Sequence, residues 1–154
     1  RDRERQSSAG EVRGVSRLRE MSGEMSGGFP VQEMRRLRQA AERGDGESLT
    51  MLGMCYYHGR GVAQSWTEAV RHWRKAVEPG FLPAHVGLGL CLMQGEGCAQ
   101  DLAAAARSFR LTAEDGDVVA QYWLAVLCEC GMGMKRDLAG AVRWYRAAAA
   151  QDHL

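Results

Sequence analysis

The sequence predicts an all-α protein, a solenoid of stacked helix-turn-helix repeats. A motif of two glycines separated by one residue occurs as Gly59-Arg60-Gly61, Gly95-Glu96-Gly97 and Gly131-Met132-Gly133, and each copy lies 36 residues after the one before. Five further columns of residues recur with the same period. They are Leu52, Leu88 and Leu124; Gly53, Gly89 and Ala125; Ala69, Ala105 and Ala141; Trp73, Phe109 and Tyr145; and Gly44, Gly80 and Gly116. A fixed period in this range is the mark of a stacked-repeat architecture.

Residues 1–30 differ in composition from the rest of the chain. They alternate arginine with acidic residues, serine and glycine, and they contain few large apolar side chains. Such a segment buries too little apolar surface to offset its ordering entropy, so we expect a flexible, disordered tail. The repeat domain is expected over residues 31–154.

The first predicted helix begins at Val31. Its apolar residues recur after three or four positions, through Met34, Leu37 and Ala40, which places them on one helical face. The helix ends at Gly44 and matches only the second half of a repeat. We therefore expect an N-terminal half repeat on which the first full unit stacks.

Three full units are predicted at about residues 45–80, 81–116 and 117–154. In the first unit, Leu49, Leu52 and Tyr56 form the apolar stripe of a helix, and Gly53 is expected to permit the close approach of a neighbouring backbone. The glycine pair then interrupts the helix. About seven helices are expected in all, and each hairpin buries its stripe against its neighbours.

A residue suited to capping precedes the second helix of each unit. Ser65, Asp101 and Asp137 share one column, and their side-chain oxygens can accept hydrogen bonds from the free N–H groups of a first helical turn. Each second helix then ends near a glycine of the column that begins at Gly44, which suits a left-handed helix end.

Composition disfavours several classes of function. The 20 Lys and Arg residues nearly balance the 19 Asp and Glu residues, so the formal net charge is only +1. A chain with so little net charge has no strong positive field to attract nucleic acid, which disfavours a nucleic-acid partner. No apolar run approaches the roughly 20 residues of a membrane span. The five cysteines are odd in number and fall mostly on predicted apolar faces, which favours free thiols in the cytoplasm or another reducing compartment.

The sequence contains no pattern typical of a catalytic, cofactor or metal site. Four histidines are scattered along the chain, at His58, His72, His85 and His153. The glycine pairs lack the third glycine of a dinucleotide fingerprint, so we interpret them as helix breakers. Cys128 and Cys130 lie two apart on a predicted helix and point to nearly opposite sides, which disfavours a shared metal. We expect no enzyme activity, cofactor, metal or small-molecule substrate.

The columns resemble the Sel1-like repeats, relatives of the tetratricopeptide repeats. In the first unit the matching residues are Leu52-Gly53, Tyr56, Gly59-x-Gly61-Val62, Ala69, Trp73 and Gly80. In the other two units they are Leu88-Gly89, Gly95-x-Gly97, Asp101, Ala105, Phe109 and Gly116, and Leu124, Gly131-x-Gly133, Asp137, Ala141, Trp144-Tyr145 and Ala147-Ala148. The resemblance covers about residues 31–154. It implies a right-handed superhelix of antiparallel helix pairs that brings other proteins into complexes and has no catalytic activity.

The resemblance also implies that the first helix of each pair lines a concave groove. The residues between its core positions would then face the groove. These are Thr50, Met54 and Tyr57; Val86, Leu90 and Met93; and Tyr122, Val126 and Glu129. The set is largely apolar, and its methionines can adapt to varied surfaces. We expect it to bind an apolar or amphipathic segment of another protein, with coverage by neighbouring helices or by the tail as the alternative.

Two arginine columns follow the predicted second helices. They are Arg35, Arg71, Arg107 and Arg143, and Arg38, Arg74, Arg110 and Arg146. Such a wall could contact an acidic partner or a nucleic-acid backbone. However, Glu42, Glu78 and Glu114 lie four residues after the second column, and we expect ion pairs between them. A solvated, salt-bridged wall is therefore favoured.

Sequence alone leaves three functions open. The leading hypothesis is a non-catalytic scaffold or adaptor, and the alternatives are an accessory subunit of a larger complex and, less favoured, an RNA-binding helical array. The last predicted helix runs to Leu154 without a polar closing helix, although terminal repeats usually need a polar outer face. We therefore expect continuation of the repeats, docking of the tail, or self-association through this C-terminal helix.

Overall fold

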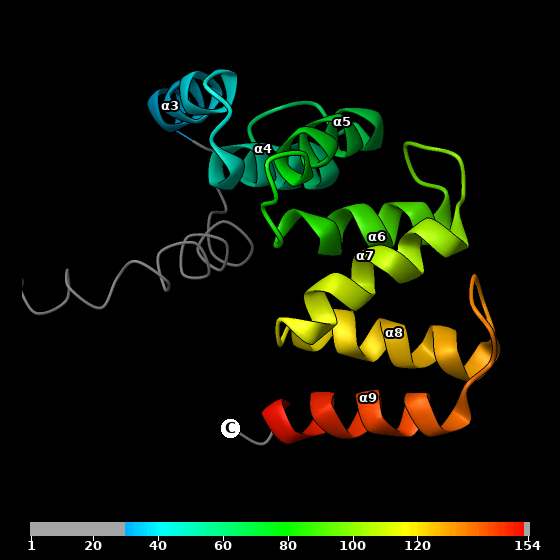
Figure 1. The fold of residues 1–154 in the computed structure, drawn as a ribbon. Coiled ribbons are helices and arrows are strands. Elements are labelled where there is room, and N and C mark those ends of the chain that lie inside the picture. The colour runs from blue at the N-terminus through cyan, green and yellow to red at the C-terminus, as the bar shows by residue number, and fades with distance from the viewer. Residues whose placement is uncertain (1–29, 153–154) are drawn as a thin grey trace, which may run out of the picture.

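Residues 30–152, which the computed structural model describes, fold into seven α-helices without a strand (Figure 1). The helices are α3 (Val31–Glu42), α4 (Gly46–His58), α5 (Trp66–Val77), α6 (Ala84–Gln94), α7 (Leu102–Glu114), α8 (Val118–Cys130) and α9 (Leu138–Asp152). The predicted all-α repeat fold is confirmed. The tail predicted for residues 1–30 lies outside the described residues, apart from Pro30.

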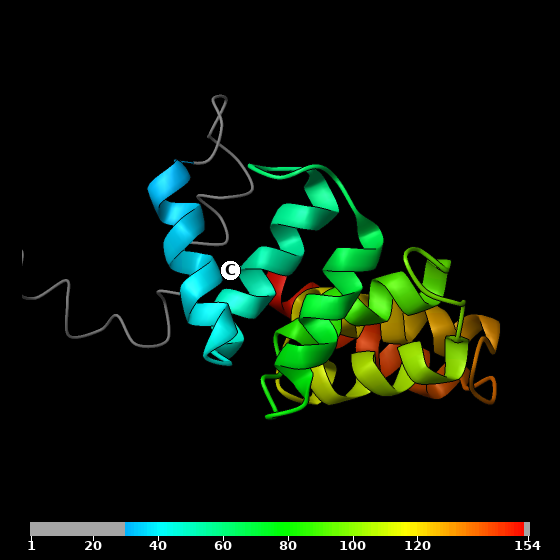
Figure 2. The same ribbon diagram turned by 90° about the horizontal axis from the view of Figure 1, so that it is seen from above.

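The helices form three hairpins, and each helix packs mainly against its neighbours in the chain. The hairpins are α4–α5, α6–α7 and α8–α9, while α3 packs on α4, α5 on α6 and α7 on α8. Figure 1 shows α3 and α9 at opposite ends of this stack, and the view from above in Figure 2 shows α3, α4 and α5 side by side. The chain therefore has two terminal helices, each with one side that no other described helix covers.

The predicted caps of the second helices are present. The backbone N–H groups of Glu68, Ala104 and Gly140 donate to the side chains of Ser65, Asp101 and Asp137, at 3.2, 3.0 and 2.9 Å. Two first helices have caps that the sequence analysis did not identify, because Asp45 accepts from Ser48 and Asp117 from Ala120. The remaining first helix, α6, begins after Pro83 without a side-chain cap.

The two glycines of each motif have different structural roles. The first glycine adopts a left-handed conformation, with φ of 71° at Gly59, 74° at Gly95 and 66° at Gly131, and ends the first helix. In the second and third units, the second glycine is where the repeat touches the preceding one. A Cβ atom at Gly97 would collide with the backbone carbonyl of Trp66, and one at Gly133 would collide with that of Leu102. The motif therefore ends a helix and also sets the spacing between repeats.

Aromatic rings of the second helices fill gaps left by glycines of the first helices. The Trp73 indole lies where a Cβ of Gly53 would be, and the Phe109 ring lies against Gly89 in the same way. The expectation for Gly53 is corrected here, because a side chain rather than a neighbouring backbone approaches it. The Trp73 Nε1–H also donates to the backbone carbonyl of Thr50 at 3.1 Å, so the ring is held by both packing and a buried hydrogen bond.

The core is divided between a large cluster and a small one. The large cluster runs through the three hairpins and includes Trp73, Leu88, Phe109 and Leu124, all less than a tenth exposed. The small cluster joins the half repeat to the first hairpin. It consists of Met34, Leu37, Met51, Leu52 and Cys55. As predicted, α3 contributes an apolar face for the first full unit.

We expect Gly97→Ala and Gly133→Ala to destabilise the fold far more than Gly116→Ala. All three glycines have positive φ, so each substitution carries the roughly 1–2 kcal/mol cost of placing an L-residue there. At Gly116 nothing lies within 4 Å of the added Cβ, whereas at Gly97 and Gly133 the Cβ meets the previous repeat's backbone. The free energy of unfolding in urea measures the difference. Equal losses for the three variants would show that the contact between repeats contributes nothing.

Candidate functional site

A cavity of about 490 Å³ lies beside α4 and α6, the first helices of the first two hairpins. It is lined by Thr50, Met54, Tyr57, His58, Trp73, Leu82, Pro83, Val86, Gly87, Leu90, Thr112, Asp115 and Asp117. Five of the residues predicted to face a groove are among them. They are Thr50, Met54, Tyr57, Val86 and Leu90. We refer to this cavity as the α4–α6 groove.

The other predicted groove residues lie elsewhere. Met93 is 9% exposed and belongs to the large core cluster. The three residues of α8 do not line the cavity, and two of them contact α9. Tyr122 packs edge-on against the Tyr145 ring at 6.0 Å, and Glu129 accepts a hydrogen bond from the Tyr145 hydroxyl at 2.7 Å. Val126 is half-buried on the same helix. The groove therefore lies along the first two hairpins, and only Asp117, the cap of α8, reaches it from the third.

Trp73 and Gly87 form a part of the groove that the sequence analysis did not assign to it. Trp73 belongs to α5, and its ring extends to α6, where a Cβ at Gly87 would lie 2.7 Å from the ring atom Cζ2. The sequence contains a sign of this feature, because Gly87 is small where the equivalent residues of the other units, Met51 and Trp123, are large. The missing side chain leaves room for the indole, which is rigid and largely apolar.

Polar groups gather at one side of the groove. Asp115 and Asp117 come from the α7–α8 link, and both residues are exposed. Asp117 uses one carboxylate oxygen to cap α8, which leaves the other free. Burial, followed by the nearby Arg60 charge, lowers the pKa of His58, so this imidazole is neutral at pH 7. The lining contains no Lys or Arg, and the groove is therefore apolar with a negative rim.

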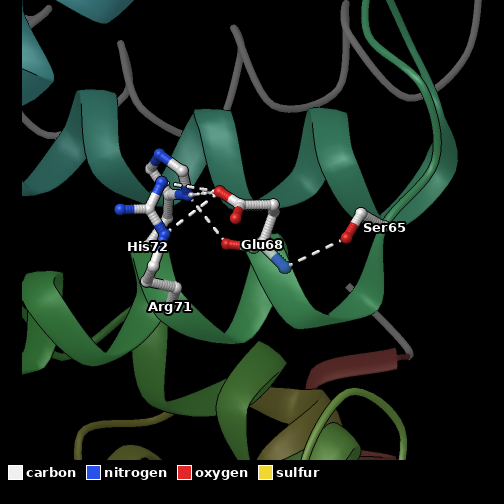
Figure 3. A network of polar contacts seen from close by, with 4 residues as sticks. All are labelled: Ser65, Glu68, Arg71 and His72. Carbon is white, nitrogen blue, oxygen red and sulfur yellow. Dashed lines mark hydrogen bonds and ion pairs between the residues drawn. The ribbon is translucent and has the colours of Figure 1, made fainter.

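Figure 3 shows a polar network on α5, the second helix of the first hairpin. The Arg71 guanidinium pairs with the Glu68 carboxylate at 2.6 Å, and this hydrogen bond lowers the pKa of Glu68. The His72 Nδ1–H donates to the Glu68 backbone carbonyl at 2.7 Å, and the imidazole stacks on Tyr56 at 5.1 Å. Burial lowers the pKa of His72, although the bond to Glu68 opposes the shift. The ring stacking joins α5 to α4, and the polar contacts link successive turns of α5.

The expected ion pairs of the second arginine column do not form. In the described part of the chain, Glu42, Glu78 and Glu114 are exposed and make no ion pair with the arginines four residues before them. The order of the charges gives the reason, because an acidic residue that precedes its basic partner is the more favourable arrangement on a helix. The Glu68–Arg71 pair has this order. All eight arginines of the two columns are exposed.

The polar side chains of residues 30–152 do not assemble a metal site. No group of three or more His, Cys, Asp or Glu residues within 30–152 is placed to hold a metal ion. His85 Nδ1 lies 3.4 Å from the Ser108 hydroxyl, but the serine is buried and burial alone shifts the pKa of His85, downward. A serine nucleophile needs a base that a third group orients. The burial of Ser108 also keeps its hydroxyl away from a substrate in solution.

Two buried cysteines, Cys55 and Cys91, are held as protonated thiols. Burial raises the pKa of Cys55 to about 11 and that of Cys91 to about 12, so both are protonated at neutral pH, and a thiol is a weak nucleophile. Cys128 is buried and Cys130 exposed, in agreement with their expected opposite directions on the helix. Within residues 30–152, no helix has the length and apolarity that crossing a membrane requires.

Comparisons with known proteins follow the same repeat boundaries. The family model for the Sel1 repeat matches three segments, residues 46–80, 82–117 and 118–153. A protective antigen of uropathogenic Escherichia coli displaying an SLR fold is similar, with a TM-score of 0.77 and 31% identity over 96% of this chain and 32% of the antigen. A Sel1 repeat protein from Oxalobacter formigenes has a TM-score of 0.69 and 34% identity over 79% of this chain and 91% of that one. This chain thus spans about a third of the antigen. No curated protein sequence matches it.

We expect Trp73→Phe to lower the free energy of unfolding by about 1–3 kcal/mol. The substitution leaves the Thr50 carbonyl without its second hydrogen bond and removes part of a well-packed ring. Trp66→Phe is the matched control, because Trp66 is 41% exposed and surface changes usually stay within about 0.5 kcal/mol. Urea unfolding of the two variants makes the comparison, and a Trp73→Phe value as small as the control would contradict the assigned hydrogen bond.

The histidines predict a loss of stability in mild acid. The pKa values of His58, His72 and His85 all lie below the ordinary 6.5 in the folded chain. The unfolded chain therefore binds more protons below that pH, and the free energy of unfolding falls as the pH drops from about 7 to about 5. The lowered pKa of Glu68 adds to this loss of stability only below about pH 4.5, the ordinary pKa of a glutamate. His72→Phe keeps a ring on Tyr56 but removes a titrating group, so it should make the free energy of unfolding depend less steeply on pH. Urea unfolding at several pH values measures this slope, and an unchanged slope would refute the role of His72.

Proposed function

Because the chain belongs to the Sel1 repeat family, we propose that it is a non-catalytic interaction module that binds a segment of another protein in the α4–α6 groove. Proteins of this family generally mediate protein–protein interactions. The observation that carries the proposal is the apolar groove itself, since its volume and exposure are unnecessary for stacking the repeats. A module that binds a protein segment and catalyses no reaction would act as a scaffold or adaptor.

The groove can supply binding energy through burial of apolar side chains. Met54, Val86 and Leu90 are only partly buried in the free protein and line the cavity together with the rigid Trp73 ring. An aromatic or aliphatic side chain placed there would gain about 1.5–3 kcal/mol. Methionine is unbranched and flexible, so Met54 can adjust to side chains of different shape. An apolar residue is therefore the expected anchor of the partner segment.

The rim selects the charge next to that anchor. Asp115 and Asp117 line the cavity, and the lining contains no Lys or Arg to neutralise their carboxylates. A Lys or Arg adjacent to the apolar anchor would meet them, and an acidic residue would be repelled. Exposed charge pairs contribute about 0.2–1 kcal/mol each, so this rim tunes selectivity while apolar burial supplies most of the affinity. The partner is thus an amphipathic segment with a basic residue.

Two alternative functions would involve a different partner. An accessory subunit of a larger complex would use the same groove for a permanent partner, and native co-purification at constant stoichiometry would identify it. RNA is disfavoured in the groove because phosphates would meet Asp115 and Asp117. The exposed arginine columns of the outer wall would be its site, and strongly salt-dependent binding of a single-stranded oligonucleotide would support that function instead.

The test is a selection from a random peptide library displayed on phage, with the full chain as bait. We expect the enriched peptides to combine an aromatic or aliphatic residue with a neighbouring Lys or Arg. Met54→Asp and Leu90→Asp should weaken these peptides at least about tenfold, because each places a carboxylate among the apolar lining residues. Calorimetric titration of a synthetic copy of an enriched peptide measures the loss.

Two further variants test whether the selected peptides bind at the groove and its acidic rim. Leu111→Asp alters a leucine that is 47% exposed and lies outside the groove, and it should leave affinity unchanged. Asp115→Lys alters a rim charge that takes part in no hydrogen bond, and it should weaken basic peptides up to about fivefold. Circular dichroism verifies that helicity is kept. Peptides that bind the Met54→Asp and Leu90→Asp variants as tightly as the parent would remove the groove as the site.

A further inference from the structure

One segment of this chain has the chemistry that the α4–α6 groove selects. The groove lining is mostly apolar, it includes Asp115 and Asp117, and it contains no Lys or Arg. A complementary segment therefore combines apolar and basic residues and lacks acidic ones. Residues 12–19 have the sequence Val-Arg-Gly-Val-Ser-Arg-Leu-Arg, with three arginines, three branched apolar residues and no Asp or Glu. They precede the residues that the structure describes.

The apolar residues of this segment are evenly spaced. Val15, Leu18 and Met21 follow one another at intervals of three, and Arg17 and Arg19 stand on either side of Leu18. Side chains three residues apart lie on one side of a bound segment, both in a helix and in a polyproline II backbone. Leu18 with its neighbouring arginines is thus the combination of apolar anchor and basic residue that suits the groove.

The adjoining parts of the N-terminal sequence lack this combination. Residues 1–11 contain as many acidic as basic residues and no large apolar side chain. Residues 20–29 contain Met25 and other apolar residues, but also Glu20 and Glu24, and no basic residue. Their carboxylates would be repelled by those of the groove rim. Residues 12–19 are therefore the part of this sequence that matches the groove.

The chain is long enough to bring this segment to the groove. Figure 2 shows that the beginning of α3 and the end of α4 lie at the same end of the helix pair, and Tyr57 and His58 at the end of α4 line the groove. Ten residues separate Arg19 from Pro30 and span at most about 33–36 Å. The α4 helix, with 13 residues, is about 20 Å long and about 10–12 Å across. The connection can therefore pass around α4.

We propose that residues 12–19 bind in the α4–α6 groove of their own chain, with Leu18 as the apolar anchor and its neighbouring arginines facing Asp115 and Asp117. This inference rests on the groove of the proposed function and adds a competitor within the same chain. A segment too polar to fold by itself orders only on binding, which keeps the contact weak enough for a partner to displace.

The tether makes a weak contact effective. A segment joined to its site by a short connection has an effective concentration of about 1 mM. With an intrinsic dissociation constant of roughly 100 µM, it would occupy the groove about ten times more often than leave it free. An external partner would then bind about tenfold more weakly than it binds the free groove. The segment thus sets a threshold of affinity that a partner has to exceed.

The first test compares peptide binding by the full chain and by its Leu18→Asp variant. The probe is a synthetic peptide with the sequence of residues 12–21, titrated calorimetrically. We expect the variant to bind the peptide about tenfold more tightly than the parent, because its own segment no longer fills the groove. Met25→Asp is the matched control and should bind like the parent. Adding Met54→Asp to Leu18→Asp should weaken the peptide at least about tenfold, with helicity verified by circular dichroism.

The second test is a cross-link within one chain. The background is Cys98→Ser with Cys130→Ser, which removes the two cysteines that are not buried. In this background, Ser16→Cys with Val86→Cys should form a disulfide on mild oxidation, read as the mass of a single chain less two hydrogens. Ser16→Cys with Leu111→Cys should not, because Leu111 is exposed on α7 outside the groove.

Equal affinity of the parent and Leu18→Asp for the peptide would overturn the contact. So would a disulfide that forms with Leu111→Cys as readily as with Val86→Cys, or one that joins two chains and thereby shows binding between copies. The proposed function fails by a different result, namely library peptides that bind Met54→Asp and Leu90→Asp as tightly as the parent. Library peptides that depend on the groove while Leu18→Asp has no effect would refute the competitor alone.

Discussion

The Trp73 indole, held between two glycines, is the contact on which much of this structure depends. Gly53 of the same hairpin and Gly87 of the next leave space for the ring, and the Thr50 carbonyl accepts its N–H. One side chain thus joins α4, α5 and α6. Because protein interiors are close-packed, a ring of this size sets how closely the two first helices approach. The same ring lines the groove, so the packing that joins the repeats also supplies a rigid part of the candidate site.

Departures from the repeat pattern create the features that distinguish one unit from another. Gly87 replaces the Met51 and Trp123 of its column, and the groove opens beside it. Phe81 stands where the other units have the capping residues Asp45 and Asp117. Consequently α6 begins without a side-chain cap, while Asp117 caps α8 and supplies charge to the rim. Shared columns build the solenoid, and the exceptions give the candidate site its shape and polarity.

The two ends of the stack differ in chemistry because a repeat protein exposes, at each end, the surface that an inner repeat would bury. At α3 this surface carries Glu33 and Arg36, which water can solvate. At α9 it carries Val142, which is 46% exposed where Val70 and Ala106 of the inner repeats are buried.

The sequence by itself determined the period, the helices, the caps at Ser65, Asp101 and Asp137, and the helix ends at the glycine pairs, because these depend on neighbours within a few residues and recur in every unit. It also identified five lining residues of the groove. Tertiary structure alone decided that Gly53 receives a ring, that Met93 turns into the core and that Tyr122 and Glu129 contact α9. It also decided that Thr112 and Asp115 reach a cavity beside α4, more than fifty residues earlier in the chain. These outcomes depend on which surfaces of distant helices meet, and a column of a repeat does not contain that information.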